Sequence, residues 1–157
     1  LLAHYECGGE CNTDGPSPSA YILYVDSKGS VAWVVRDADT PNGVPGDVVT
    51  GRTDVADGQW HHVLAVLDPA SGALAVYVNG ELDHAPYSLV DNDGSGFAQD
   101  IIEDIDPITV GYNRAASTGS VTSTFGGLID ELSVYSAALT EADARALHGA
   151  GIAGKCE

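Results

Sequence analysis

The sequence predicts an all-β fold, an antiparallel sandwich of two sheets with a short C-terminal helix. Short apolar runs rich in β-branched residues recur along the 157 residues, and turn residues separate them, with 19 Gly and 7 Pro in total. Only one stretch, near the C-terminus, carries the end signals of a helix. The length suits one domain, residues 1–157, with room for a buried core.

The net charge excludes some classes of binding partner. The chain has 6 Lys and Arg residues against 23 Asp and Glu residues, a net charge of −17, although 44% of its residues are hydrophobic. So acidic a surface repels phosphate backbones and anionic lipid headgroups, and we expect no nucleic acid partner. No apolar run reaches the roughly 18 residues of a membrane helix, so we expect no membrane insertion.

The first predicted pair of strands is a hairpin. Residues 21–25 (YILYV) run into a polar turn at 26–29, and residues 31–35 (VAWVV) return. Pro, Gly and Asp then predict a loop over 37–47, which precedes a short strand at 48–52.

A second hairpin has the clearest pattern in the chain. Residues 60–67 (WHHVLAVL) and 73–78 (ALAVYV) flank a turn at 68–72. Asn79-Gly80 is a signal for a two-residue hairpin turn, and it predicts a further strand over 81–83.

The last third of the chain contains a long connection, two strands and the helix. Residues 84–106 read as an acidic connection, 108–112 as a strand and 125–135 as the last long strand. Thr140 is a suitable N-cap for a helix that Gly149 would end.

The cysteines indicate an oxidising compartment. Cys7 and Cys11 bracket two glycines that let the chain fold back, so we expect a local disulfide between them. The alternative is half of a zinc site, but no second Cys or His pair follows at a suitable spacing. Cys156 then has no assigned partner.

Four motifs keep an order and spacing that are typical of a known family. They are DGQWHHV (57–63), LAVYVNG (74–80), ITVGYN (108–113) and GLIDELSVY (127–135). Together they resemble the centre of a bacterial laminin G-like domain of the concanavalin A-like lectin and glucanase superfamily. The resemblance implies a jelly-roll sandwich of two antiparallel sheets, in agreement with the strand pattern.

The same resemblance implies that opening strands are missing. Family members usually begin with further strands, one of them central, whereas Leu1 stands part-way into the domain. We therefore expect an N-terminally truncated or excised part of a larger protein. An upstream polypeptide or a neighbouring copy is expected to complete the sheet beside residues 21–25 and 31–35.

Catalysis is not expected. Enzymes that share this sandwich act on polysaccharides, and those that hydrolyse them need two carboxylates facing one cleft. Asp130 and Glu131 are adjacent, so on a strand they would point to opposite faces. Apart from Glu81 and Asp83 in the three-residue strand 81–83, no predicted strand carries carboxylates two residues apart, and no Gly-x-Ser-x-Gly motif is present.

Calcium is the expected cofactor. Residues 91–96 (DNDGSG) match the first half of a calcium loop, with Asp91, Asp93 and Ser95 as ligands, although Ile102 stands where the last acidic ligand belongs. An ordinary solvated acidic loop explains these residues equally well. The resemblance adds Asp130 as a further calcium ligand, with a buried, hydrogen-bonded carboxylate as the alternative.

The expected ligand contacts are exposed aromatic and amide side chains: Tyr24, Tyr112 and Asn113. Trp33 and Trp60 are expected in the core, and His61 and His62 to pack or to form a hydrogen bond at the rim.

The leading hypothesis is a non-catalytic binding or adhesion module of a secreted or cell-surface bacterial protein. It would recognise a glycan or an extracellular protein and be stabilised by calcium. The alternative is a structural building block of a cell-surface assembly, and the third hypothesis is a polysaccharide-active enzyme.

Overall fold

The computed structural model describes residues 2–4, 21–35, 47–88, 108–114 and 121–151. These ranges contain antiparallel sheets and one helix, which confirms the predicted sandwich with a short C-terminal helix. The elements are β1 (Leu2–His4), β2 (Tyr21–Val25), β3 (Ser30–Val35), β4 (Asp47–Asp54), β5 (Val63–Asp68), β6 (Ala73–Val78), β7 (Glu81–Leu82), β8 (Tyr87–Ser88), β9 (Thr109–Val110), β10 (Tyr112–Arg114), β11 (Val121–Thr124) and α1 (Glu141–Ala150).

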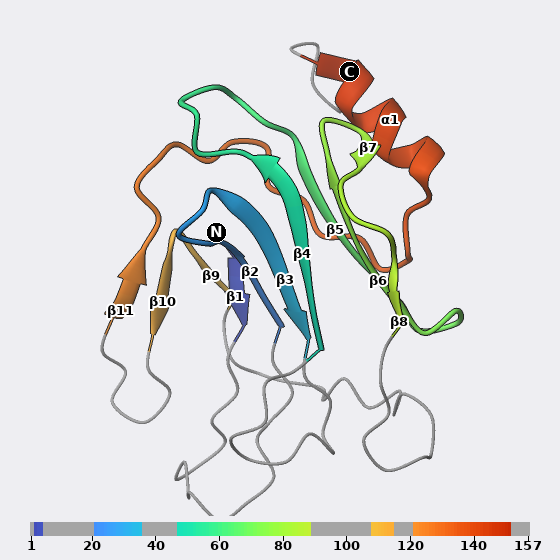
Figure 1. The fold of residues 1–157 in the computed structure, drawn as a ribbon, viewed down its shortest axis with the longest axis horizontal. Coiled ribbons are helices and arrows are strands. Elements are labelled where there is room, and N and C mark those ends of the chain that lie inside the picture. Colours follow the sequence, from blue (N-terminus) through green and yellow to red (C-terminus); the bar gives the residue numbers. More distant parts are fainter. Residues whose placement is uncertain (1, 5–20, 36–46, 89–107, 115–120, 152–157) are drawn as a thin grey trace, which may run out of the picture.

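The strands form two layers and a small ribbon. Sheet A has the order β4-β3-β2-β1-β9, and sheet B consists of β5, β6 and β7 with β8 also paired to β6. β10 and β11 form a separate two-stranded ribbon. Figure 1 shows sheet A on the left, sheet B on the right, and α1 against β7 at the upper end of sheet B.

The β2–β3 hairpin forms as predicted. Its turn is closed by the Asp26 carboxylate, whose Oδ1 accepts hydrogen bonds from the backbone N–H groups of Lys28 (2.8 Å) and Ser30 (2.9 Å). Gly29 occupies the left-handed region at φ 83°, and a side chain there would meet Asp54 Oδ1 at 2.0 Å.

Sheet B also follows its sequence pattern. β5 and β6 pair in continuous antiparallel register from Val63↔Val78 to Asp68↔Ala73. Asn79 and Gly80 both have positive φ, 53° and 81°, as the predicted two-residue turn into β7 requires.

The main core lies where β3 and β4 of sheet A face β6 of sheet B. It is built from buried residues of both layers: Val31, Trp33, Val35, Val49, Leu74, Val76 and Val78. Leu74 and Val76 have no exposed surface, and Trp33 is buried as expected. Apolar burial in this region is therefore the main source of the fold's stability.

One carboxylate joins the two sheets. Asp83, which follows β7, reaches β4 and accepts hydrogen bonds from the backbone N–H groups of Arg52 (2.9 Å) and Thr53 (3.1 Å) and from the Thr53 hydroxyl (2.5 Å). Gly51 leaves room for it, because a Cβ there would lie 2.0 Å from Asp83 Oδ2. A polar clamp thus holds the two layers together beside the apolar core.

The helix begins as predicted and ends later. Thr140 and Asp143 form a reciprocal capping box, whereas the C-cap is Gly151 rather than the predicted Gly149. The helix buries Ala144 completely and lies so close to the β6–β7 turn that a Cβ on Gly80 would meet Arg145 Cα at 3.1 Å.

The predicted last long strand over residues 125–135 is wrong. The described chain between β11 and α1, residues 125–139, forms no strand and is called here the crossing segment. Figure 1 shows it running from the top of β11 across the molecule to the base of α1. Its apolar alternation is typical of a strand, but it forms no ladder with any described strand, and Leu128 is 78% exposed.

Two other predicted strands have different bounds. Gly111, at φ 80°, breaks the predicted strand 108–112 into β9 and β10, which belong to different sheets. The predicted strand 60–67 begins only at Val63, and the described start of the 84–106 connection leads into the short strand β8. The predicted loop 37–47 lies outside the described residues except for Asp47, the first residue of β4.

The expectation that β2 and β3 border a gap is also wrong. β2 pairs with β1 on one side and β3 on the other, and β3 pairs with β2 and β4. Both are interior strands of sheet A, so a missing strand beside them has no place in this topology.

Candidate functional site

The loop that joins β4 to β5, residues 55–62, carries the most exposed aromatic side chain of the described chain and is called here the Trp60 loop. Trp60 is 67% exposed, so the expectation that it belongs to the core is wrong. Because β5 begins three residues later, Trp60 precedes the strand instead of packing within it. Tryptophan combines a large apolar ring with one polar N–H group and is enriched at interfaces, so an exposed Trp60 is a candidate ligand contact.

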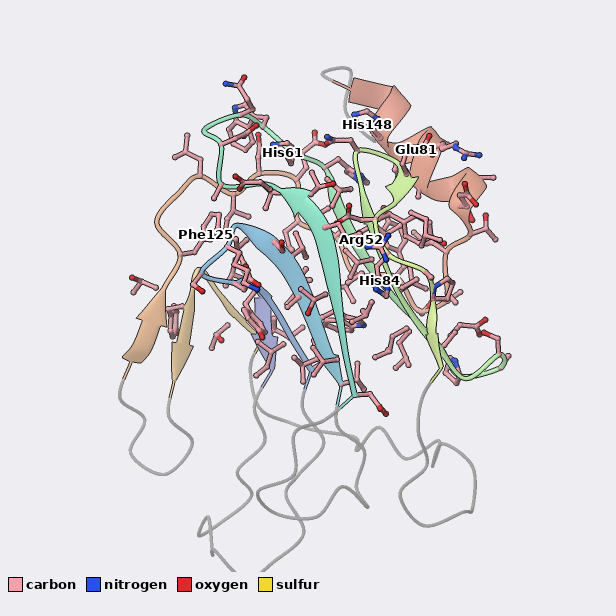
Figure 2. All side chains as sticks on the ribbon, viewed as in Figure 1. Arg52, His61, Glu81, His84, Phe125 and His148 are labelled. Carbon is pink, nitrogen blue, oxygen red and sulfur yellow. The ribbon has the colours of Figure 1, made fainter. Side chains whose placement is uncertain are left out.

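A polar network around His61, which Figure 2 labels, fixes this loop. His61 Nε2 lies 3.0 Å from Asp57 Oδ1, and His61 Nδ1 lies 3.1 Å from Asn79 Nδ2. Asp57 Oδ1 also accepts the backbone N–H of Gln59 at 2.8 Å. The network spans the Trp60 loop and the β6–β7 turn, so it holds the loop against sheet B.

The network also determines which nitrogen of His61 carries the proton. Asn79 Oδ1 accepts the backbone N–H of His62 at 3.1 Å, which leaves Asn79 Nδ2 as the donor to His61 Nδ1. Nδ1 is therefore the acceptor of a neutral imidazole, and Nε2–H donates to Asp57.

Asp57 is the acidic end of the network. The hydrogen bond from His61, followed by that from the Gln59 backbone, lowers the pKa of Asp57 below its ordinary value of 3.8. The carboxylate stays ionised at neutral pH, and its side chain is 42% exposed. Within the described part of the chain, Oδ2 accepts no hydrogen bond from another residue, so it can accept one from a ligand hydroxyl.

Both ring nitrogens of His61 have hydrogen-bond partners, Asp57 at Nε2 and Asn79 at Nδ1. His61 thus forms the rim hydrogen bond expected from the sequence. His62 packs instead, with its ring centroid 6.1 Å from that of His148 on α1.

The predicted ligand residues lie on two different sheets. Tyr24 is on β2 of sheet A and Tyr112 on β10 of the two-stranded ribbon, and both are exposed. Tyr24 lies on the face of β2 away from the core, because it alternates with Leu23, which packs against the core. Asn113 is in β10, but its side chain lies outside the described residues.

Of the predicted calcium ligands, only Asp130 lies in the described part of the chain. Asp91, Asp93 and Ser95 lie outside the described residues, as do Cys7, Cys11 and Cys156. Asp130 is on the crossing segment, where it is exposed and accepts the backbone N–H of Glu131 at 2.8 Å, so the buried alternative is wrong. Among the described residues, no group of three His, Cys, Asp or Glu side chains could hold a metal ion.

The sequence contains a turn signal that predicts the Trp60 loop, but the apolar pattern of residues 60–67 predicts a strand instead. Asp57-Gly58 is a turn pair, and its side-chain hydrogen bond to Gln59 together with φ 82° at Gly58 extends the loop past Trp60. The turn residues Asp57 and Gly58 thus determine the local structure here, although the residues that follow have the apolar pattern of a strand.

Comparison with known families identifies the class of protein. A laminin G family model, described as the concanavalin A-like lectin/glucanases superfamily, matches residues 8–145. This chain therefore belongs to that superfamily, as its motifs and its sandwich of antiparallel sheets predicted.

Comparison with individual proteins is less informative. No curated protein gives a significant match. A similar solved structure is the 2.1 Å crystal structure of an S-layer domain-containing protein (residues 221–444) from Clostridium thermocellum ATCC 27405, with 15% identity and a TM-score of 0.42. The match covers 93% of this chain and 60% of that one, so the chain spans less than two thirds of that structure. No helix in the described ranges is long and apolar enough to cross a membrane.

Proposed function

We propose that this chain is a non-catalytic binding module of a secreted or cell-surface bacterial protein, and that it recognises a glycan or a protein partner. Membership of a superfamily of lectins and glucanases supports this proposal. The observation that carries it is the Trp60 loop, where an indole that is 67% exposed lies three residues along the chain from a carboxylate that is hydrogen-bonded to His61.

The Trp60 loop has the two parts that sugar binding needs. The apolar face of a sugar ring stacks on an exposed indole, and Asp57 Oδ2 accepts a hydrogen bond from a ring hydroxyl. The net charge of −17 disfavours acidic glycans, so the ligand would be a neutral or cationic sugar. The engaged His61 supports binding without turnover.

The test uses Trp60 as its own reporter. In a Trp33→Phe background, Trp60 is the only tryptophan, and titration with a soluble neutral β-glucan should change its fluorescence in a saturable way. Trp60→Ala, followed by calorimetry, should lower the affinity at least tenfold, whereas Tyr24→Ala should leave it within about twofold. Equal binding by the Trp60→Ala protein, or tighter binding of heparin than of the neutral glucan, would refute this assignment.

Calcium belongs to the proposal as a stabiliser of the fold. A metal that binds only the folded state raises its stability by mass action. Millimolar calcium should therefore raise the melting temperature, and Asp93→Ala or Asp130→Ala should reduce that gain, whereas Asp68→Ala should not. A melting curve that calcium leaves unchanged would remove calcium from the proposal.

A protein partner is the second candidate, because β5 lies at the edge of sheet B with a paired neighbour on one side only among the described strands. A strand edge binds polypeptide backbone rather than sugar.

A further inference from the structure

One residue, Asn79, makes three hydrogen bonds between the β6–β7 turn and the Trp60 loop. Its Oδ1 accepts the backbone N–H of His62 at 3.1 Å, and its Nδ2 donates to His61 Nδ1, also at 3.1 Å. The backbone N–H of Asn79 donates to the His62 carbonyl at 2.8 Å. The side-chain amide therefore uses its acceptor for the loop backbone and its donor for the imidazole.

The Asn79 amide can serve both partners only while the imidazole of His61 is neutral. A protonated imidazole carries N–H on both ring nitrogens and accepts no hydrogen bond. Nδ1–H of His61 would then face the NH₂ group of Asn79, a donor against a donor. If the amide turned over to offer Oδ1 to His61, its NH₂ group would face the backbone N–H of His62. In either arrangement, one of the two side-chain bonds between the turn and the loop is lost.

The bond from His61 to Asp57 responds to protonation in the opposite sense. Asp57 accepts from Nε2, which carries a proton in both forms of the ring. The bonds from His61 and the Gln59 backbone hold the pKa of Asp57 below its ordinary value of 3.8, so Asp57 stays ionised throughout the range in which histidines titrate. A positive imidazole strengthens this bond. Because Asp57 and His61 belong to the same loop, protonation strengthens a contact inside the loop and breaks one between the loop and sheet B.

We propose that His61 and Asn79 form a pH-sensitive contact, which holds the Trp60 loop against sheet B when His61 is neutral and releases it when His61 is protonated. This inference rests on the proposed function, because it concerns the regulation of sugar binding at Trp60. Trp60 directly precedes His61, so release of the loop frees the indole from a fixed position. A neutral glucan therefore binds more weakly at mildly acidic pH than at neutral pH.

Other titratable side chains surround this contact. They come from the loop itself, from β7, and from α1, which packs on the β6–β7 turn: Asp57, His62, Glu81, Arg145 and His148. Glu81 and Arg145 form an ion pair with each other at 3.2 Å. His62 and His148, whose ring centroids are 6.1 Å apart, are also histidines, and this residue type titrates between about pH 5 and 8. The experiment must therefore separate His61 from these two.

The first measurement needs no sugar. Nuclear magnetic resonance of the intact 157-residue chain follows the imidazole and side-chain amide nitrogens between about pH 8 and pH 5. His61 should be the Nε2–H tautomer at the upper end of this range, and the NH₂ signals of Asn79 should shift as His61 is protonated. In the Trp33→Phe protein, the fluorescence anisotropy of Trp60 should fall over the same range, because the released loop moves more freely.

Matched variants in the Trp33→Phe protein test the direction of the effect. The carboxylate of Asn79→Asp can accept both the His62 backbone N–H and a protonated His61, so the fall in anisotropy at low pH should disappear or reverse. His148→Gln removes the neighbouring histidine on α1 and should leave the fall unchanged. The resonance measurement uses the unaltered protein, so it decides the matter even if Asn79→Asp fails to fold.

The second measurement titrates the soluble neutral β-glucan. Its affinity should be about fivefold lower at the acidic end of the range, as expected for the loss of one hydrogen bond. An Nδ1–H tautomer of His61 at neutral pH, or an equal fall in anisotropy in the Asn79→Asp protein, would overturn the pH-sensitive contact. Equal glucan affinity at both ends of the range, although the loop is released, would overturn the regulation. Absence of glucan binding at every pH refutes the proposed function instead, and the sugar-free measurement still decides the contact.

Discussion

The two ends of the sandwich differ in how they use apolar residues. Where β3 and β4 face β6, Val31, Leu74 and Val76 have no exposed surface, and Asp83 clamps the layers with hydrogen bonds to β4. Away from this packed region, Val110 of β9, Trp60 in the β4–β5 loop and Leu128 of the crossing segment are also apolar, but they remain exposed. The same residue types stabilise the fold in one region and stay exposed in the others, because only the first has a facing layer.

The largest expected difference in stability is between removing a leucine side chain from the core and removing one from the crossing segment. Leu74→Ala leaves a cavity at a fully buried position and should lower the free energy of unfolding by about 2–5 kcal/mol. Leu128→Ala, on the crossing segment, should change it by no more than about 0.5 kcal/mol. Urea unfolding measures both, and a comparable loss from Leu128→Ala would show that the crossing segment is packed in solution.

The polar clamp should come next in size. Asp83→Asn replaces one carboxylate oxygen by an amide NH₂ that faces the N–H donors of Arg52 and Thr53, and should destabilise the fold by about 1–3 kcal/mol. Asp68→Asn is the control, since Asp68 bonds only Ala70 and Ser71 in its own turn. If Asp68→Asn lowers the free energy of unfolding as much in the same assay, the effect of Asp83→Asn does not come from the lost hydrogen bonds between the sheets.

The helix cap should have a smaller effect. Thr140→Ala removes the hydroxyl that accepts the Asp143 backbone N–H at 3.2 Å and should cost about 1 kcal/mol. Thr140→Ser keeps that hydroxyl and should retain most of the stability. Thermal unfolding followed by circular dichroism compares the two, and equal losses would assign the effect to the methyl group of Thr140.

The smallest effect is expected from the ion pair that docks the helix. Arg145 donates to Glu81 from Nε and Nη2, both at 3.2 Å, and these bonds lower the pKa of Glu81 below its ordinary value of 4.5. Stability from this pair is therefore present above the ordinary pKa and lost as pH falls through the lower folded-state pKa. Glu81→Gln should be slightly less stable than the wild type at neutral pH, and the two should converge in acid; a gap that persists in acid would contradict the ionic origin.

The sequence predicted the packed end of the molecule well. The hairpin β2–β3 and the run from β5 to β7 have local turns, Asp26-to-Gly29 and Asn79-Gly80, that fix their registers without help from the rest of the chain. Thr140 likewise marks its helix through contacts three residues away. Local chemistry was sufficient for these elements.

The open end could not be predicted in the same way. The pattern of residues 125–135 is that of a strand, but a strand also needs a neighbour, and pairing depends on residues far away in sequence. The exposure of Trp60 depends likewise on where β5 begins, which is three residues after it. Periodicity identifies which side chains are apolar, whereas topology decides which of them are covered.

The Asn79-Gly80 turn is a site where the protein can be chemically modified over time. Asparagine before glycine is prone to deamidation, which converts the side-chain amide to a carboxylate. At Asn79 that change would replace the amide donor to His61 Nδ1 by an acceptor and would place a second carboxylate beside the imidazole. The bonds that now hold the Asn79 amide to His61 and to the His62 backbone restrain its side chain. Deamidation of this one turn would then add a negative charge beside the loop that carries Trp60.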